Sequence, residues 1–237
     1  MTGLAGKSVL VVGGSSGIGQ AVAAQAAAAG AVVTIASRST EKLAKAAAAI
    51  GGDIRTAAFD STDADAVAAF FEGQPAFDHV VVSAAVTPIA AMRDLSLADA
   101  RSAMESKFWG AYHVARGARF TERASLTLVS GFLADRPMAG AALQGAINAA
   151  LDSLARGLAL EMSPVRVNSV SPGMIDTPLW ADMDAAARQA MYDSVADSVP
   201  AKVMGQPGDV ANAVLYLMQT PFSTGSTVRV DGGGAIG

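Results

Sequence analysis

Residues 8–29 read SVLVVGGSSGIGQAVAAQAAAA, and this stretch decides the fold. The run 8–12 is apolar and β-branched at consecutive positions, which is typical of a strand buried on both faces of a parallel sheet. Glycines and serines at 13–19 end the run, and the alanine-rich segment after them has high helix propensity. Glycines let the backbone approach a ligand closely, and the free N–H groups of a first helical turn favour a phosphate. The stretch therefore predicts a nucleotide-binding turn rather than a loose surface turn.

The rest of the chain continues this alternation of strands and helices. Strands are expected at residues 8–12, 31–37, 54–59, 78–85, 125–131, 165–171 and 226–231, and helices at 41–50, 62–72, 96–120, 141–162 and 207–218. Thr62 with Asp65, and Ser96 with Asp99, have the spacing of helix N-terminal capping boxes. Such an alternation predicts an α/β protein with a doubly wound, parallel, seven-stranded sheet and helices on both faces. Its ligands are expected beyond the carboxyl ends of the strands.

Length and composition limit the classes of function. The chain has 237 residues, of which 51% are hydrophobic and 16% charged, so one domain with a large core is expected. A net charge of −4 argues against nucleic acid or an anionic membrane as the main partner. The sequence has no cysteine, which excludes disulfides and thiolate chemistry, and no metal site is expected. Without a leader-like or ~20-residue apolar segment, we expect a cytoplasmic protein.

Several segments together resemble the short-chain dehydrogenase/reductase family. The turn VVGGSSGIG, with Gly13, Gly17 and Gly19, has the family's glycine spacing. RVNSVSPG at 166–173 with IDTP at 175–178, and TG at 224–225 with VDGG at 230–233, resemble later family segments. The resemblance spans nearly the whole chain. It implies a Rossmann-type fold in one domain over 1–237, a small-molecule substrate, a substrate lid at about 176–200, and a homo-oligomer (tetramer or dimer) built on the two long helices.

The same resemblance implies which residues bind a dinucleotide. They are Gly13, Ser15, Ser16, Gly17, Ile18 and Gly19 in the turn, Asp60 at the adenine, Ser83, Ala84 and Ala85 where the family has Asn-Ala-Gly, and Pro172, Gly173, Ile175 and Thr177 near the nicotinamide and pyrophosphate. The second strand ends in Ser37 and Arg38 instead of a carboxylate. A carboxylate would repel a ribose phosphate, whereas a guanidinium matches phosphate oxygens. We therefore predict NADP(H) over NAD(H); the alternative is that Arg38 is merely solvated and Asp60 only begins a turn.

The catalytic positions depart from the family. By resemblance, Ser130 fits the family's serine, Gln144 stands at the tyrosine and Asn148 at the lysine position, and Lys107 stands where the family has asparagine. In this interpretation, lysine and asparagine have exchanged helices. Gln144 and Asn148 are one helical turn apart, so both amides are expected to point inward. Lys107 is the one charged member of an apolar helical stripe, and the alternative is that it extends to solvent.

Two functions fit these residues. The first is an NADP(H)-dependent oxidoreductase acting on a small carbonyl, alcohol or imine, in which Ser130 and Gln144 bind a developing oxyanion and Lys107 supplies the proton. Gln144 has no acidic proton to give, and Asp135 is a weaker candidate acid. The second is a catalytically impaired dinucleotide-binding sensor or partner subunit. In the lid, Trp180, Met183, Met191 and Tyr192 suggest an apolar pocket wall or simple lid packing.

Overall fold

The computed structural model describes residues 3–237, and its centre is a sheet of seven parallel strands. The strand order is β3-β2-β1-β4-β5-β6-β7, which confirms the expected doubly wound Rossmann-type fold. The chain reverses its direction of winding between β1 and β4, so that the carboxyl ends of these two central strands flank a crevice. The strands are β1 Ser8–Val12, β2 Val32–Ser37, β3 Arg55–Ala58, β4 Phe77–Val82, β5 Phe120–Val129, β6 Arg166–Pro172 and β7 Thr227–Val230.

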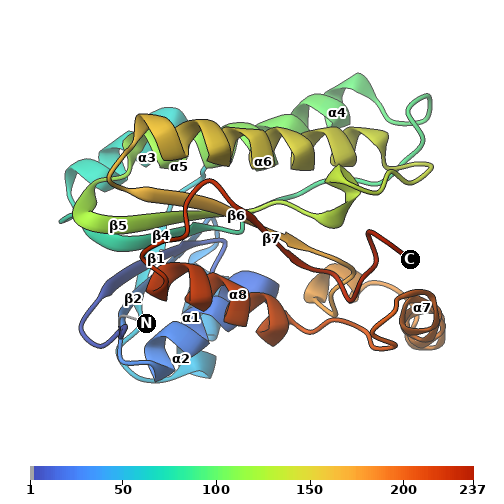
Figure 1. Cartoon of the computed structure of the whole chain (residues 1–237), viewed down its shortest axis with the longest axis horizontal. Helices are drawn as coiled ribbons and strands as arrows, with labels where there is room; N and C mark the ends of the chain where they lie inside the picture. The colour runs from blue at the N-terminus through green and yellow to red at the C-terminus, as the bar shows by residue number, and fades with distance from the viewer. Residues whose placement is uncertain (1–2) are drawn as a thin grey trace.

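Helices cover both faces of the sheet (Figure 1). One face carries α1 Gly17–Ala28, α2 Thr40–Ile50 and α8 Pro207–Gln219, and the other carries α3 Ala64–Glu72, α4 Leu97–Met104, α5 Gly110–Gly117 and α6 Ala142–Glu161. Each face has its own apolar core. The α7 helix, Ala185–Ser198, lies at the end of the molecule near the C-terminus (Figure 1).

The opening stretch folds as predicted, because its glycines permit two close approaches. Gly13 has φ +85°, and a Cβ there would lie 2.5 Å from the backbone N of Ala84. A Cβ on Gly19 would lie 2.2 Å from the carbonyl O of Gly13. The turn is therefore pressed against both the end of β4 and the first turn of α1, which only glycine allows.

Three local predictions were wrong, and one helix was not predicted. The helix expected at 96–120 is divided into α4, a π-helical turn η1 Glu105–Trp109, and α5, and it ends at Gly117 because β5 already begins at Phe120. The cap of α3 is Asp63, which accepts bonds from the N–H groups of Asp65 and Ala66, while the Thr62 hydroxyl bonds Asp60. The β4 strand ends at Val82, so residues 83–85 lie in a loop. The α7 helix was not expected within the lid.

Candidate functional site

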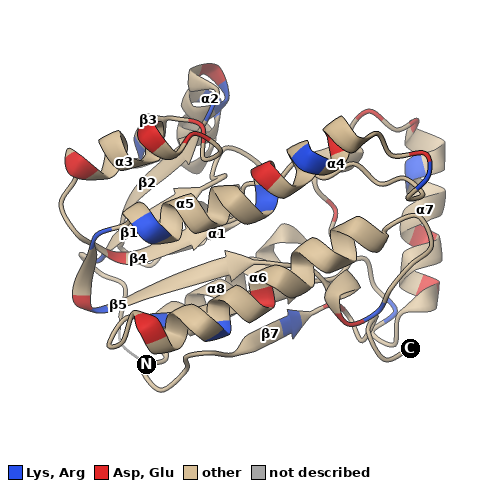
Figure 2. Ribbon diagram, turned by 90° about the horizontal axis from the view of Figure 1, so that it is seen from above, with Lys and Arg blue, Asp and Glu red and all other residues tan. Residues whose placement is uncertain are grey.

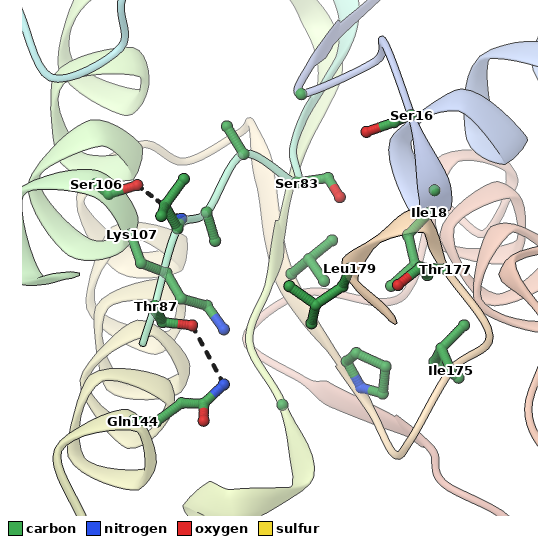
Figure 3. Close-up of a pocket in the computed structure, with 18 of the residues that line it drawn as sticks. Ser16, Ile18, Ser83, Thr87, Ser106, Lys107, Gln144, Ile175, Thr177 and Leu179 are labelled. Carbon is green, nitrogen blue, oxygen red and sulfur yellow. Dashed lines mark hydrogen bonds between the residues drawn. The ribbon is translucent and has the colours of Figure 1, made fainter. Parts of the chain in front are cut away.

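A pocket of about 680 Å³ lies at the carboxyl ends of the strands, where the topology predicts it. Figure 3 shows Lys107, Thr87 and Gln144 on one side of it and Ile18, Ile175 and Thr177 on the other. All but one of the residues predicted to bind cofactor line this pocket, as do Ser130, Gln144, Asn148 and Lys107. The exception is Gly19, which lies behind the turn against Gly13.

The glycine turn forms the end of the pocket that precedes α1. Ser16 is the N-cap of α1, but its side chain makes no capping hydrogen bond. The hydroxyl of Ser16 and the first N–H groups of α1 are thus available to an anion beside Gly17, which has φ +53°. This is the geometry expected of a pyrophosphate site.

A second anion-compatible region lies where β2 and β3 end. The Ser37 hydroxyl is buried and has no hydrogen-bond partner among residues 3–237. The Arg38 side chain is 66% exposed, with its NH1 4.0 Å from Asp60 Oδ2, so this long contact leaves the guanidinium free to bind a ligand. Asp60 accepts bonds from the backbone N and the hydroxyl of Thr62, both at 2.9 Å, and therefore begins a turn as well as lining the pocket. Lys42 adds a second cation here that the sequence analysis did not single out.

Lys107 is buried at the other end of the pocket. Its Nζ donates to the carbonyl O of Ser130 at 2.7 Å and to Asn148 Oδ1 at 2.5 Å, and the residue is only 8% exposed. Lys107 and Asn148 therefore contact each other directly, and the alternative of a solvent-extended lysine is wrong. Burial disfavours the ammonium form and lowers the pKa of Lys107 to about 8, while the charge of Asp152 opposes this shift.

Lys107 lies in a π-helical turn. The turn occupies Glu105–Trp109 between two α-helical segments, and within it Lys107 is the buried residue. A π-turn inserts an extra residue and rotates the side chains that follow. The preceding Ser106 hydroxyl accepts the N–H of Val86 at 2.8 Å, which ties this turn to the loop after β4 (Figure 3).

Gln144 and Ser130 complete this end of the pocket. Gln144 Nε2 donates to the Thr87 hydroxyl at 3.2 Å, and Gln144 Oε1 is buried with no partner among the described residues. The Ser130 hydroxyl donates to the carbonyl O of Val170 at 3.3 Å, a long bond that a ligand can replace. Asp135 Oδ2 instead pairs with Arg229 Nε at 2.8 Å, which holds the pKa of Asp135 below its usual value. It is therefore a poor proton donor.

The lid contributes less pocket wall than the sequence suggested. Trp180 lines the pocket together with Leu179, whereas Met183, Met191 and Tyr192 do not. The Tyr192 hydroxyl instead donates to Asp176 Oδ1 at 2.5 Å, which attaches α7 to the segment after β6. Trp180 Nε1 donates to the carbonyl O of Ile175 at 2.9 Å.

Among the polar pocket residues that sequence reasoning missed are Thr87, Ser106 and Lys42. Thr87 lies in an irregular loop where no periodicity orients side chains, and Ser106 is aimed by the unexpected π-turn. Lys42 stands in the first turn of α2, three residues beyond its N-cap Ser39, and that position close to Arg38 was an available signal.

Three further observations concern the distribution of charge, membrane-spanning helices and metal clusters. Figure 2 shows Lys and Arg interspersed with Asp and Glu along the helices. No helix within residues 3–237 has the length and apolar character needed to cross a bilayer. Over the same residues, no cluster of three or more His, Cys, Asp or Glu side chains is arranged to hold a metal ion.

Comparisons with known proteins agree with this architecture. A family model described as Enoyl-(Acyl carrier protein) reductase matches residues 12–234. The short-chain dehydrogenase/reductase ATR9 of Stachybotrys chlorohalonatus is 32% identical, covering 98% of both chains. The cyclic-di-GMP-binding biofilm dispersal mediator protein of Escherichia coli (strain K12) is 33% identical, again covering 98% of both.

Two solved structures resemble the whole chain. One is a small-chain dehydrogenase in complex with NADPH, with a TM-score of 0.84 and 32% identity over 98% of this chain and 100% of that one. The other is an NADPH-bound short-chain oxidoreductase from Pseudomonas aeruginosa PAO1 described as containing an atypical catalytic center, with a TM-score of 0.88 and 27% identity over 96% of both chains. The family model, the relatives and the fold agree over almost the full length: this chain belongs to the short-chain dehydrogenase/reductase family.

Proposed function

We propose that the protein is an NADP(H)-dependent oxidoreductase that acts on a small carbonyl, alcohol or imine with a non-standard catalytic set. The observation that carries the proposal is the position of Lys107. Its amine lies in the pocket between Ser130 and Asn148, although it comes from the helix where the family has asparagine. By the resemblance, Lys107 thus brings an amine to the part of the pocket that the family's lysine would occupy, but from the opposite wall.

The residues present fit NADP(H). The first turn of α1 with Ser15, Ser16 and Gly17 would hold the pyrophosphate, and the unpartnered Ser37 hydroxyl with the exposed Arg38 guanidinium would hold the ribose phosphate. Toward the reacting end, the pocket lining includes Ser83, Ala84 and Ala85 after β4, and Pro172, Gly173, Ile175 and Thr177 at and after the end of β6. When bound, the nicotinamide supplies hydride transfer.

The chain's own groups then handle the oxygen and the proton. The Ser130 hydroxyl and Gln144 Nε2 can each donate a hydrogen bond to a developing oxyanion, a form of stabilisation that can outweigh proton transfer itself. Because the pKa of Lys107 is lowered to about 8, its ammonium can release a proton near neutral pH. An already cationic acceptor, such as an iminium, would not need this proton. The wall formed by Val86, Ile89, Met138, Leu179 and Trp180 favours an apolar substrate body.

The first experiment separates binding from turnover. NADPH and NADH binding are measured by fluorescence, followed by NADPH oxidation with a panel of ketones, enones and imines. Lys107→Met should reduce carbonyl turnover by ~10²–10⁴-fold, as expected for loss of a general acid, whereas the exposed control Lys45→Met should behave like wild type. Full activity in Lys107→Met would refute the proposed role of this lysine.

A reconstruction tests the assignment of positions. The triple variant Gln144→Tyr, Asn148→Lys, Lys107→Asn places the family's tyrosine, lysine and asparagine at the positions that the resemblance gives them. We expect faster carbonyl reduction than in wild type. Unchanged activity in a folded, NADPH-binding variant would count against the alignment.

The second candidate is a dinucleotide-binding sensor or partner subunit without turnover. Its support is Gln144, an amide that cannot donate a proton, at the position of the family's tyrosine. Tight NADPH binding without turnover of any substrate in the panel would favour this candidate.

We also propose that the protein is a cytoplasmic homo-oligomer, a tetramer or a dimer, with one domain and a substrate lid at about 176–200. Exposed apolar side chains on the long helices, Trp109 beside α5 and Leu160 near the end of α6, support the oligomer. Light scattering after size-exclusion chromatography measures the assembly, and a monomer would refute it.

A further inference from the structure

A buried carboxylate lies behind Lys107. Asp152 is 6% exposed and stands on α6 one helical turn after Asn148. Both residues face inward, since side chains four positions apart share a face of a helix. Asn148 in turn accepts the bond from Lys107 Nζ. Asp152 is thus in the wall that holds the pocket lysine, although it does not line the pocket itself.

The carboxylate of Asp152 has a buried oxygen that lacks a hydrogen bond to any described residue. Its Oδ1 is buried and has no hydrogen-bond partner among residues 3–237. A buried carboxylate without local bonds is costly unless a positive charge compensates it. Two cations interact with it electrostatically, Lys107 from the pocket side and Arg229 from β7. Arg229 already forms a 2.8 Å ion pair with Asp135, so Lys107 is the cation with no other carboxylate partner.

The groups that accept hydrogen bonds from Lys107 carry no charge. The end of β5 offers the carbonyl O of Ser130, and α6 offers the amide of Asn148, both neutral. Within the described part of the chain, the charged group that acts on the Lys107 ammonium is Asp152. Burial opposes the charged form of Lys107, and a nearby negative charge favours it.

We propose that Asp152 is a positioning residue: its buried negative charge keeps Lys107 protonated and directed toward Asn148, so that the pocket presents an ammonium rather than a neutral amine. The inference deepens the proposed function and depends on it for its catalytic meaning. Asp152 acts through Lys107 and does not itself contact a substrate. Without this charge, a lysine buried beside neutral groups would be protonated to a smaller extent at neutral pH.

The decisive measurement observes the amine directly and needs no turnover. The chain has five lysines, at positions 7, 42, 45, 107 and 202, and the other four are exposed. With lysine labelled by ¹³C at Cε, NMR should show one signal that titrates near pH 8 and disappears in Lys107→Met. In Asp152→Asn, which keeps the shape and removes the charge, we expect this midpoint to fall by about one pH unit. The control Glu161→Gln, which removes an exposed charge from the same helix, should leave it unchanged.

Two further variants keep the test decisive. Asp152→Glu retains the charge and should keep the midpoint close to that of wild type. Asp152→Ser removes the charge with a smaller side chain and gives the same comparison if the amide is poorly accommodated. An unmoved Lys107 midpoint in the charge-removing variants would overturn the proposal and leave Asp152 as a partner of Arg229 alone.

The pH dependence of turnover separates this inference from the proposed function. If both hold, the basic limb of the pH profile moves to lower pH in Asp152→Asn by the same amount as the NMR midpoint. A moved NMR midpoint in a protein without turnover supports the role of Asp152 and contradicts the oxidoreductase. Turnover with an unmoved midpoint supports the oxidoreductase and contradicts the role of Asp152.

Discussion

Burying Lys107 makes the stability of this protein depend on pH in a specific direction. The pKa of Lys107 is lowered from 10.5 to about 8 in the folded state, because burial penalises the ammonium. Between these values the unfolded chain binds more protons than the folded one, so the free energy of unfolding rises with pH. The stability penalty is fully present below pH 8 and disappears as the pH approaches 10.5. At 1.36 kcal/mol per pH unit, it amounts to roughly 3 kcal/mol.

The prediction is a difference in slope between wild type and Lys107→Met. From pH 7 to pH 9.5, we expect the wild type to gain about 2 kcal/mol relative to the variant. The variant also leaves the carbonyl of Ser130 and Asn148 Oδ1 without their donor, which costs ~1–3 kcal/mol for each buried acceptor. That loss is the same at both pH values. It therefore lowers the free energy of unfolding of the variant by a constant amount and does not change how its slope against pH differs from that of wild type.

Urea unfolding followed by circular dichroism at several pH values measures this difference. Lys45→Met, which removes an exposed lysine, should run parallel to wild type. The titrations of tyrosines and of the other lysines are common to wild type and Lys107→Met, and they cancel in the comparison. If the curves of wild type and Lys107→Met also run parallel between pH 7 and 9.5, Lys107 is not a buried cation and the description of the site is wrong.

Three further predictions concern the cofactor site and the sheet. Arg38→Ala should weaken NADPH binding by about 10- to 100-fold and leave NADH binding unchanged, whereas equal weakening of both in a fluorescence titration would contradict the ribose-phosphate assignment. Gly19→Ala places a Cβ 2.2 Å from the Gly13 carbonyl, so a lower Tm and loss of NADPH binding are expected, and wild-type binding would contradict the tight turn. Burial lowers the pKa of His79 from 6.5 to about 4, so between these pH values the unfolded chain binds more protons than the folded one. As the pH falls from 6.5 to 4.5, the free energy of unfolding of the wild type should therefore decrease by about 2 kcal/mol relative to His79→Gln. Denaturant titrations measure this difference, and parallel curves would refute it.

Much of the candidate site could be predicted because it depends on short segments of sequence, such as strand ends and glycine turns. The turn at Gly13 and Gly17 follows from a buried strand, glycines and a helix in succession. The position of Arg38 follows from the end of β2. Residues at strand ends converge on one edge of a parallel sheet whatever the details of packing, which is why these predictions did not need coordinates.

The direction of single side chains was harder to predict. Asp63, and not Thr62, caps α3, since both types can cap and only the backbone geometry selects between neighbouring positions. The α7 helix has no buried residue, so its sequence lacks the apolar periodicity from which a helix is predicted.

The sequence by itself determined the alternation of strands and helices and the glycine turn between the first strand and the first helix. The tertiary structure decided that Lys107, in a π-helical turn, meets Asn148 on another helix. It also decided that Asp152 stands buried behind that contact. These facts depend on how two helices far apart in the chain pack against the same sheet, and helical periodicity alone does not fix the distance between side chains on different helices.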